Sequence, residues 1–137
     1  MTGRGLEMIE NVYKQITKNI EVEVIPIFVP DQTQFPGHFL YTYNVSITNH
    51  SQDSCQLLSR KWVIVDGDGN KETVEGEGVV GEQPHLGPGQ NYQYSSYCPL
   101  PTETGNMRGS FFFVDSKGQD FEVQVPLFFL RKDAILQ

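Results

Sequence analysis

The chain of 137 residues is short of basic residues and of long apolar runs. It carries ten lysines and arginines against seventeen aspartates and glutamates, a formal net charge of −7 at pH 7. A surface of this sign repels phosphate backbones and anionic lipids, so we expect neither nucleic acid nor a membrane as a partner. No run approaches the roughly 20 apolar residues of a membrane span, and no signal-peptide pattern follows Met1. A cytoplasmic protein is therefore expected.

Cysteine is scarce, with only Cys55 and Cys98 in the chain. In a cytoplasmic protein we expect two separate, reduced thiols. The alternative is the disulfide of immunoglobulin domains, but those domains carry a tyrosine two residues before the second cysteine, where this chain has Ser96. A nucleophilic cysteine also needs a neighbouring base, and the sequence places none beside either thiol.

Catalytic and metal-binding patterns built on histidine are missing as well. His38, His50 and His85 do not pair at ligand spacing, so an imidazole site for a metal such as cobalt is not expected. No Ser-His-Asp or Cys-His order can be recognised in the chain. We therefore predict that the protein is not an enzyme and has no tightly bound cofactor.

What the sequence does contain is alternation of apolar and polar residues. It is clearest over residues 20–24, 39–48, 91–96 and 121–129. Strand side chains point alternately to the two faces of a sheet, so each segment is predicted to be a strand with one face in a core. Glycine, proline, asparagine and aspartate separate the segments. The pattern predicts an all-β sandwich or barrel of about seven to eight antiparallel strands in one domain.

The ends of the chain are expected to lie outside this domain. Residues 1–12 are predicted to be a flexible N-terminal segment, residues 13–132 the β-sandwich domain, and residues 133–137 a C-terminal tail. The stretch 9–20 also has near-helical spacing of apolar residues, but its alternation favours a strand from about residue 13. Trp62, beside two apolar neighbours, is predicted to be buried in the core.

Gly76, Gly78 and Gly81 match the G-x-G-x-x-G fingerprint of dinucleotide-binding enzymes. That motif must open a helix, whose N-terminal amides bind the pyrophosphate. Here two prolines and two glycines follow within residues 84–89, and they oppose a helix. We therefore predict that these glycines shape the backbone. The alternative is a cradle of glycine-loop amides that binds a pyrophosphate or a nucleotide.

The acidic stretch from Asp66 to Glu77 partly matches a calcium-binding loop. Asp66, Asp68 and Glu77 stand at ligand positions 1, 3 and 12 of that loop, but Lys71 stands where the loop requires glycine. A hairpin turn rich in Asp, Gly and Asn is the simpler prediction. The alternative is a weak divalent-cation site formed by these carboxylates.

Two phenylalanines are candidates for an interaction surface. Alternation within residues 110–114 puts Phe112 on the face opposite its neighbours, and alternation within 126–130 does the same for Phe128. If both point outward, they form an apolar patch of the kind that marks protein contacts. The alternative is that another segment covers them.

Three stretches of the sequence resemble the bacterial ApaG family, also called CorD. They read LLSRKWVIVDGDGN, VEGEGVVGEQPHLGPGQNYQYSS and CPLPTETGNMRGSFFFVDSKGQDFEVQVPLFFL. The specific features are the run 78–84 with Pro88-Gly89, and Trp62 followed by Asp66 and Gly69. The resemblance extends over about residues 13–131. One departure is Tyr97, where relatives usually carry glycine.

This resemblance implies an immunoglobulin-like or fibronectin-III-like sandwich with no established enzymatic activity. It also implies a link to cobalt resistance and magnesium efflux, and in eukaryotic relatives a role in protein interaction. We therefore expect a small non-enzymatic binding or regulatory module, monomeric or homodimeric, that contacts a protein partner and takes part in divalent-cation homeostasis. The alternative is a pyrophosphate-, nucleotide- or metal-binding protein that uses the loop 76–81.

Overall fold

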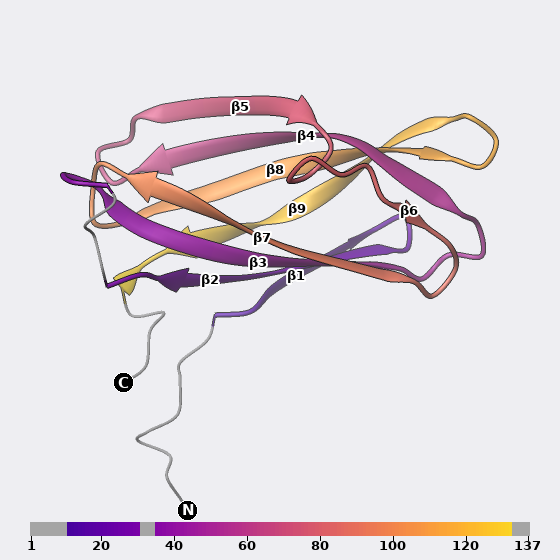
Figure 1. Cartoon of the computed structure of the whole chain (residues 1–137), viewed down its shortest axis with the longest axis horizontal. Helices are drawn as coiled ribbons and strands as arrows, with labels where there is room; N and C mark the ends of the chain where they lie inside the picture. The colour runs from indigo at the N-terminus through magenta and orange to yellow at the C-terminus, as the bar shows by residue number, and fades with distance from the viewer. Residues whose placement is uncertain (1–10, 31–34, 133–137) are drawn as a thin grey trace, which may run out of the picture.

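The computed structural model describes residues 11–30 and 35–132, which form two antiparallel sheets packed face to face (Figure 1). In spatial order, the first sheet contains β1 (Tyr13–Thr17), β2 (Ile20–Phe28), β3 (Phe39–Asn49) and β7 (Asn91–Leu100). The second contains β5 (Lys71–Glu77), β4 (Cys55–Asp66), β8 (Gly105–Asp115) and β9 (Asp120–Leu130), while the two-residue strand β6 (His85–Leu86) pairs with β4. The predicted all-β sandwich is confirmed, with nine strands in the described residues where seven to eight were expected.

The predicted chain ends fall mostly outside the described residues. Of the N-terminal segment 1–12 only residues 11–12 are described, and the tail 133–137 is not. Strand β1 begins at Tyr13, where the alternation places it. The described part of the chain has no helix of the length and hydrophobicity needed to cross a membrane.

The inward-facing residues of the two sheets form one apolar core. In β2, Ile20, Val22 and Val24 are at most 1% exposed, and the residues between them are partly exposed. Trp62 of β4 is 4% exposed, and its ring centroid lies 5.6 Å from that of Tyr43. The predicted burial of Trp62 is confirmed. Burial of each such side chain stabilises the fold by about 1.5–3 kcal/mol.

The turn between β1 and β2 consists of Lys18 and Asn19. Both residues have positive φ, 50° and 66°. Such a two-residue loop is a type I′ turn, whose twist matches that of the flanking strands. It folds β1 back onto β2 with Thr17 opposite Ile20.

A bulge in β4 turns Arg60 toward the inner face of its sheet. The pairing of β4 with β8 shifts by one residue between Leu57 and Ser59, so Leu58 is an extra residue in the ladder. An extra residue reverses the alternation beyond it. As a result, Arg60 shares the inner face with Trp62.

A second bulge, in β9, makes the predicted outward position of Phe128 wrong. The pairing of β8 with β9 shifts by one residue between Met107 and Gly109, opposite the stretch that contains Pro126. Proline has no N–H for the ladder and is found at bulges. The alternation reverses there, so Phe128 is fully buried with its ring centroid 5.7 Å from that of Tyr43.

The two lateral sides of the sandwich differ. On one side β9 lies against β1 and β2, and the backbone N–H of Gln124 donates to Thr17 Oγ1 over 3.2 Å. On the other side β5 and β7 are the last strands of their sheets, and among residues 11–30 and 35–132 each is paired along only one edge. We call this second side, bounded by β5 and β7, the open side.

Candidate functional site

A groove lies along the open side, between β5 and β7. Its larger part is a cleft of about 300 Å³, with Glu72 and Val74 of β5 on one wall and Tyr97 of β7 on the other. Trp62 and Ile64 contribute to its floor. A smaller hollow of about 120 Å³ also involves Ile64 and Glu72. The groove therefore combines an apolar floor with a carboxylate on its β5 wall.

Arg60 connects this groove to the glycine loop, residues 76–82. Its Nη1 donates to the carbonyl oxygens of Glu77 and Gly78, both over 3.0 Å. A Cβ atom at Gly76 would lie 2.7 Å from the same Nη1, so Gly76 leaves room for the guanidinium. No sequence pattern marks Arg60, because only the bulge in β4 brings it to the inner face.

Backbone amides of the glycine loop donate to carbonyl groups of the protein. The N–H of Gly78 donates to the Leu58 carbonyl over 2.8 Å, while Val79 and Glu82 each donate to the other's carbonyl. Gly78 and Gly81 have φ of +63° and +82°, which favours glycine. A Cβ at Gly78 would also lie 2.3 Å from the Glu82 carbonyl oxygen. The geometry agrees with the predicted backbone role of these glycines, and three loop amides already have protein acceptors.

The acidic stretch forms a hairpin turn and does not gather its carboxylates. The Asp66 carboxylate accepts the N–H groups of Asp68 and Asn70, both over 2.9 Å, and the Asn70 side-chain amide over 3.2 Å. Glu77 stands at the far end of β5, about 20 Å from this turn at the usual rise of a strand. The described residues contain no group of three or more potential metal ligands. The predicted hairpin turn is therefore observed, and the alternative, a joint cation site of Asp66, Asp68 and Glu77, does not fit this placement.

Phe112 and Phe128 do not form a common surface. Phe112 is half-buried on the outer face of the second sheet, where it lines a shallow hollow of about 390 Å³ with Leu58 and Phe121. Phe128 lies in the core on the opposite face of that sheet. The predicted interaction surface is therefore wrong in its second member, because the bulge at Pro126 exchanges the two faces of β9.

The same bulge exposes two other apolar residues of β9. Leu127 is 46% exposed and Phe129 is 42% exposed. Phe129 pairs with Asn106, which also pairs with Val65 of β4, while Val63 of β4 lies one row further along the same face. We call Val63, Val65, Leu127 and Phe129 the outer patch.

The two cysteines are free, in agreement with the predicted separate thiols, and both are buried. Burial raises the pKa of the Cys55 thiol to about 11 and that of the Cys98 thiol to about 12. A thiol attacks as the thiolate, so both groups are poorly suited to nucleophilic chemistry near neutral pH.

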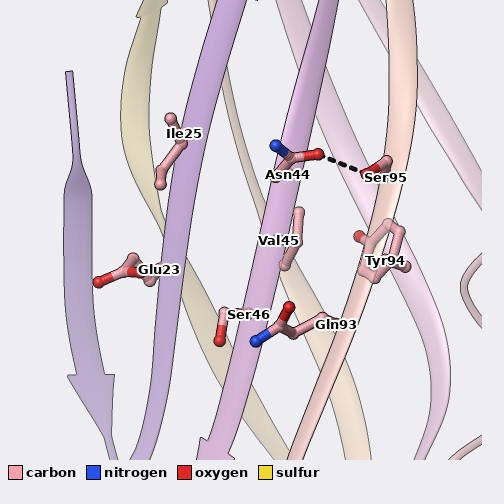
Figure 2. Close-up of a pocket in the computed structure, with 8 residues that line it drawn as sticks. All are labelled: Glu23, Ile25, Asn44, Val45, Ser46, Gln93, Tyr94 and Ser95. Atoms are coloured by element: carbon pink, nitrogen blue, oxygen red, sulfur yellow. Dashed lines mark hydrogen bonds between the residues drawn. The ribbon is translucent and has the colours of Figure 1, made fainter. Parts of the chain in front are cut away.

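The outer face of the first sheet carries a shallow, polar depression of about 470 Å³ (Figure 2). Asn44 of β3 and Ser95 of β7 point toward one another there, and the serine hydroxyl donates to the asparagine oxygen. Nearby, the Asn91 amide donates to the hydroxyls of Ser46 and Thr48, both over 2.8 Å. The outward side chains of β7 are thus neutral, and those of Asn91, Gln93 and Ser95 lie in or beside this depression.

Residues 30–115 match the family model described as the ApaG domain. The Protein ApaG of Anaeromyxobacter dehalogenans (strain 2CP-C) is 44% identical over 113 residues, which cover 82% of this chain and 90% of that protein. The Protein ApaG of Afipia carboxidovorans is 45% identical over 120 residues, covering 87% of this chain and 92% of that protein. A crystal structure of an ApaA protein from Bordetella pertussis is 38% identical, with 90% of this chain and 95% of that chain covered and a TM-score of 0.76.

These matches include the features described above. The segment 30–115 contains the glycine loop, Arg60 and both walls of the groove. The similarity to the relatives extends over more than four-fifths of the chain, and their names state no enzymatic activity. With its sandwich, its glycine loop and this degree of identity, the chain belongs to the ApaG family.

Proposed function

We propose that this protein is a non-enzymatic module that binds a protein partner through the outer patch. The observation that carries the proposal is the exposure of Leu127 and Phe129 of β9 on the same outer face as Val63 and Val65 of β4. Asn106 and Arg108 of β8 lie between the two apolar pairs. Large apolar side chains exposed on one face of a small protein and bordered by polar residues mark contact sites. The Arg131 guanidinium lies 5.8 Å from the centroid of the Phe129 ring, so the edge of this surface also carries a cation.

The chemistry of the titratable side chains supports a binding role over a catalytic one. The buried thiols have raised pKa values. His50 Nε2 lies 2.9 Å from a carboxylate oxygen of Glu21 on an exposed face, outside every hollow described above. His38 contacts the Pro36 carbonyl oxygen in a loop. These groups do not converge on a shared reaction centre.

The proposal places any role in cobalt or magnesium homeostasis in the partner protein. The carboxylates of Asp66 and Glu77 lie at opposite ends of β5, so direct cation binding has little support from their placement. A pyrophosphate or nucleotide bound at the glycine loop is supported less than protein binding, because the amides of Gly78, Val79 and Glu82 already donate to carbonyls. The cytoplasmic location stays a prediction.

The test is partner capture with a double variant, Leu127→Asp together with Phe129→Asp. The two charges should abolish binding at the outer patch, because a carboxylate buried in an apolar contact without a partner is strongly unfavourable. Ile16→Asp is the matched control, since Ile16 is 57% exposed on β1 of the other sheet. Each folded variant is cross-linked in cells of the source organism, and captured proteins are quantified by mass spectrometry. We expect proteins that Ile16→Asp retains and the double variant loses; identical captures would contradict the proposal.

A further inference from the structure

Within the part of the chain that the structure describes, strand β7 has a long edge without a paired strand, and this edge lacks the usual protection against pairing. Edge strands are commonly blunted by charges, bulges or proline. The ten residues of β7 include no charged side chain, and their register with β3 is unbroken from Asn91 to Leu100. Pro99 is the single proline of the strand and lies near its end. Such an edge is a template for another strand.

The hydrogen bonds of the first sheet show which groups of β7 point to this edge. The N–H of Asn49 donates to the carbonyl of Gln90 over 2.9 Å, which makes these two a hydrogen-bonded pair. Hydrogen-bonded and non-bonded pairs alternate along antiparallel strands. Residues 92, 94, 96 and 98 therefore bond to β3, whereas residues 91, 93, 95 and 97 direct their N–H and C=O groups outward. Pro99 belongs to the outward set, where it has no N–H to offer.

This edge borders the groove of the open side. The outward groups from Asn91 to Tyr97 extend over about 20 Å at the usual rise of a strand. A strand added beside them would send alternate side chains toward the groove. The floor there contains Trp62 and Ile64, which fit apolar side chains.

The charges of the groove favour a cationic occupant. The Arg60 guanidinium already donates to two carbonyls, and the Asp66 carboxylate already accepts the N–H groups of its turn. Lys71 lies only in the smaller hollow, so the larger cleft is lined by two charged residues. Arg60 is turned to the carbonyls of the glycine loop, and Glu72 is the carboxylate that a bound segment would meet there. The net charge of −7 acts in the same direction over longer distances.

We propose that β7 binds an extended segment of a partner protein as an added strand. Its apolar side chains enter the groove, and a lysine or arginine faces Glu72. A second copy of this chain is a poorer occupant, because each copy carries −7 and would bring the acidic β5 of both copies to one interface. The site is separate from the outer patch, which lies on the outer face of the other sheet.

The experiment selects ligands for the full chain from a random twelve-residue peptide library displayed on phage. We expect selected peptides in which apolar residues alternate with other residues and lysine or arginine is enriched. Added as synthetic peptides, they should shift the amide NMR signals of residues 91–98. Two N-methylated versions of one peptide, methylated at alternate positions, provide the backbone test. One version should lose binding and the other keep it, because only one edge of the peptide bonds to β7.

A pair of variants tests the receiving edge. Gln93→Pro removes an outward N–H without removing a bond to β3, and should weaken peptide binding about tenfold, as expected for one lost hydrogen bond. Gln93→Ala, which keeps the N–H, should bind within about twofold of the parent chain. Thermal unfolding establishes that both variants fold, and the N-methylated peptides decide the question if Gln93→Pro does not.

Several results would overturn the proposal. These are a failure to select any peptide, equal binding of both N-methylated versions, or peptide-induced shifts confined to the outer patch. A concentration-dependent dimer with the β7 edge protected from hydrogen exchange would identify a second copy as the occupant instead. The double variant Leu127→Asp and Phe129→Asp should still bind the peptides, so failure of the proposed function and failure of this inference can be told apart.

Discussion

Strands β5 and β7 border the same groove but offer very different edges. Within seven residues β5 carries Lys71, Glu72, Glu75 and Glu77, whereas the ten residues of β7 carry no charge. A charged edge resists pairing because an added strand would have to accommodate or desolvate those groups, while an uncharged one does not. The comparison shows that the side chains along an edge, as well as its length, decide whether it can receive another strand.

The largest expected effect comes from proline placed at two neighbouring positions of β7. Tyr94→Pro removes a hydrogen bond to β3 and a ring that packs against Phe111, and should destabilise the fold by about 4 kcal/mol or more. Gln93→Pro should cost about 1 kcal/mol, because its N–H points to the open edge. Urea denaturation of both variants measures the difference, and equal losses would contradict the assignment of the free edge.

On the β5 side, two glycine-to-alanine changes separate the cost of a steric clash from the cost of a positive φ. Gly78→Ala should destabilise the fold by about 2–4 kcal/mol for two reasons. The new Cβ would clash with the Glu82 carbonyl, and alanine disfavours the positive φ of this position. Gly81→Ala, whose Cβ would meet nothing within 4 Å, should cost about 1 kcal/mol from φ alone. Chemical denaturation tests this order, which a reversed ranking of the two variants would contradict.

Arg60→Met should cost about 2 kcal/mol, because it leaves the carbonyls of Glu77 and Gly78 without their charged donor. The loss should be local to the β5 side. Hydrogen exchange is expected to accelerate for the amides of residues 78–82 and to stay unchanged along β7. Equal acceleration on both sides of the groove would show that Arg60 supports the whole open side.

A smaller effect is expected from Cys98 of β7 at alkaline pH. Burial raises its pKa to about 12, so the unfolded chain loses the thiol proton first as pH rises through the ordinary range of a thiol. The stability contributed by the neutral thiol is complete below that range and is lost above it, by roughly 1 kcal/mol at pH 10. The free energy of unfolding at pH 7 and pH 10 should fall less in Cys98→Ala than in the parent chain. Parallel pH profiles would contradict the attribution to Cys98.

Much of the fold could be predicted from the sequence because the alternation of single strands is local information. The pattern of β2 follows from it directly, and the burial of Trp62 follows from its size and its apolar neighbours. The predicted turn role of Asp66 also depends only on neighbours, since its carboxylate accepts N–H groups two and four residues away. Such features need no knowledge of which strands are adjacent.

The remaining features depend on pairing between strands. The bulge at Leu58 brings Arg60 inward, and the bulge near Pro126 buries Phe128 while exposing Phe129. One extra residue in a ladder reverses every later side chain, and alternation read from one strand does not reveal it. Pro126 was the available signal, because proline within a strand marks an edge or a bulge. The free edge of β7 follows only from the strand order.

The most direct test of the account is native-state hydrogen exchange along β7 in the free protein. Outward amides without a partner exchange faster than amides bonded to β3. We predict fast exchange at residues 91, 93, 95 and 97 and slow exchange at residues 92, 94, 96 and 98. A period of two, independent of protein concentration, would show an unpaired edge ready to receive a strand. Uniform protection of all eight amides would contradict the central claim, because the edge would then already be occupied.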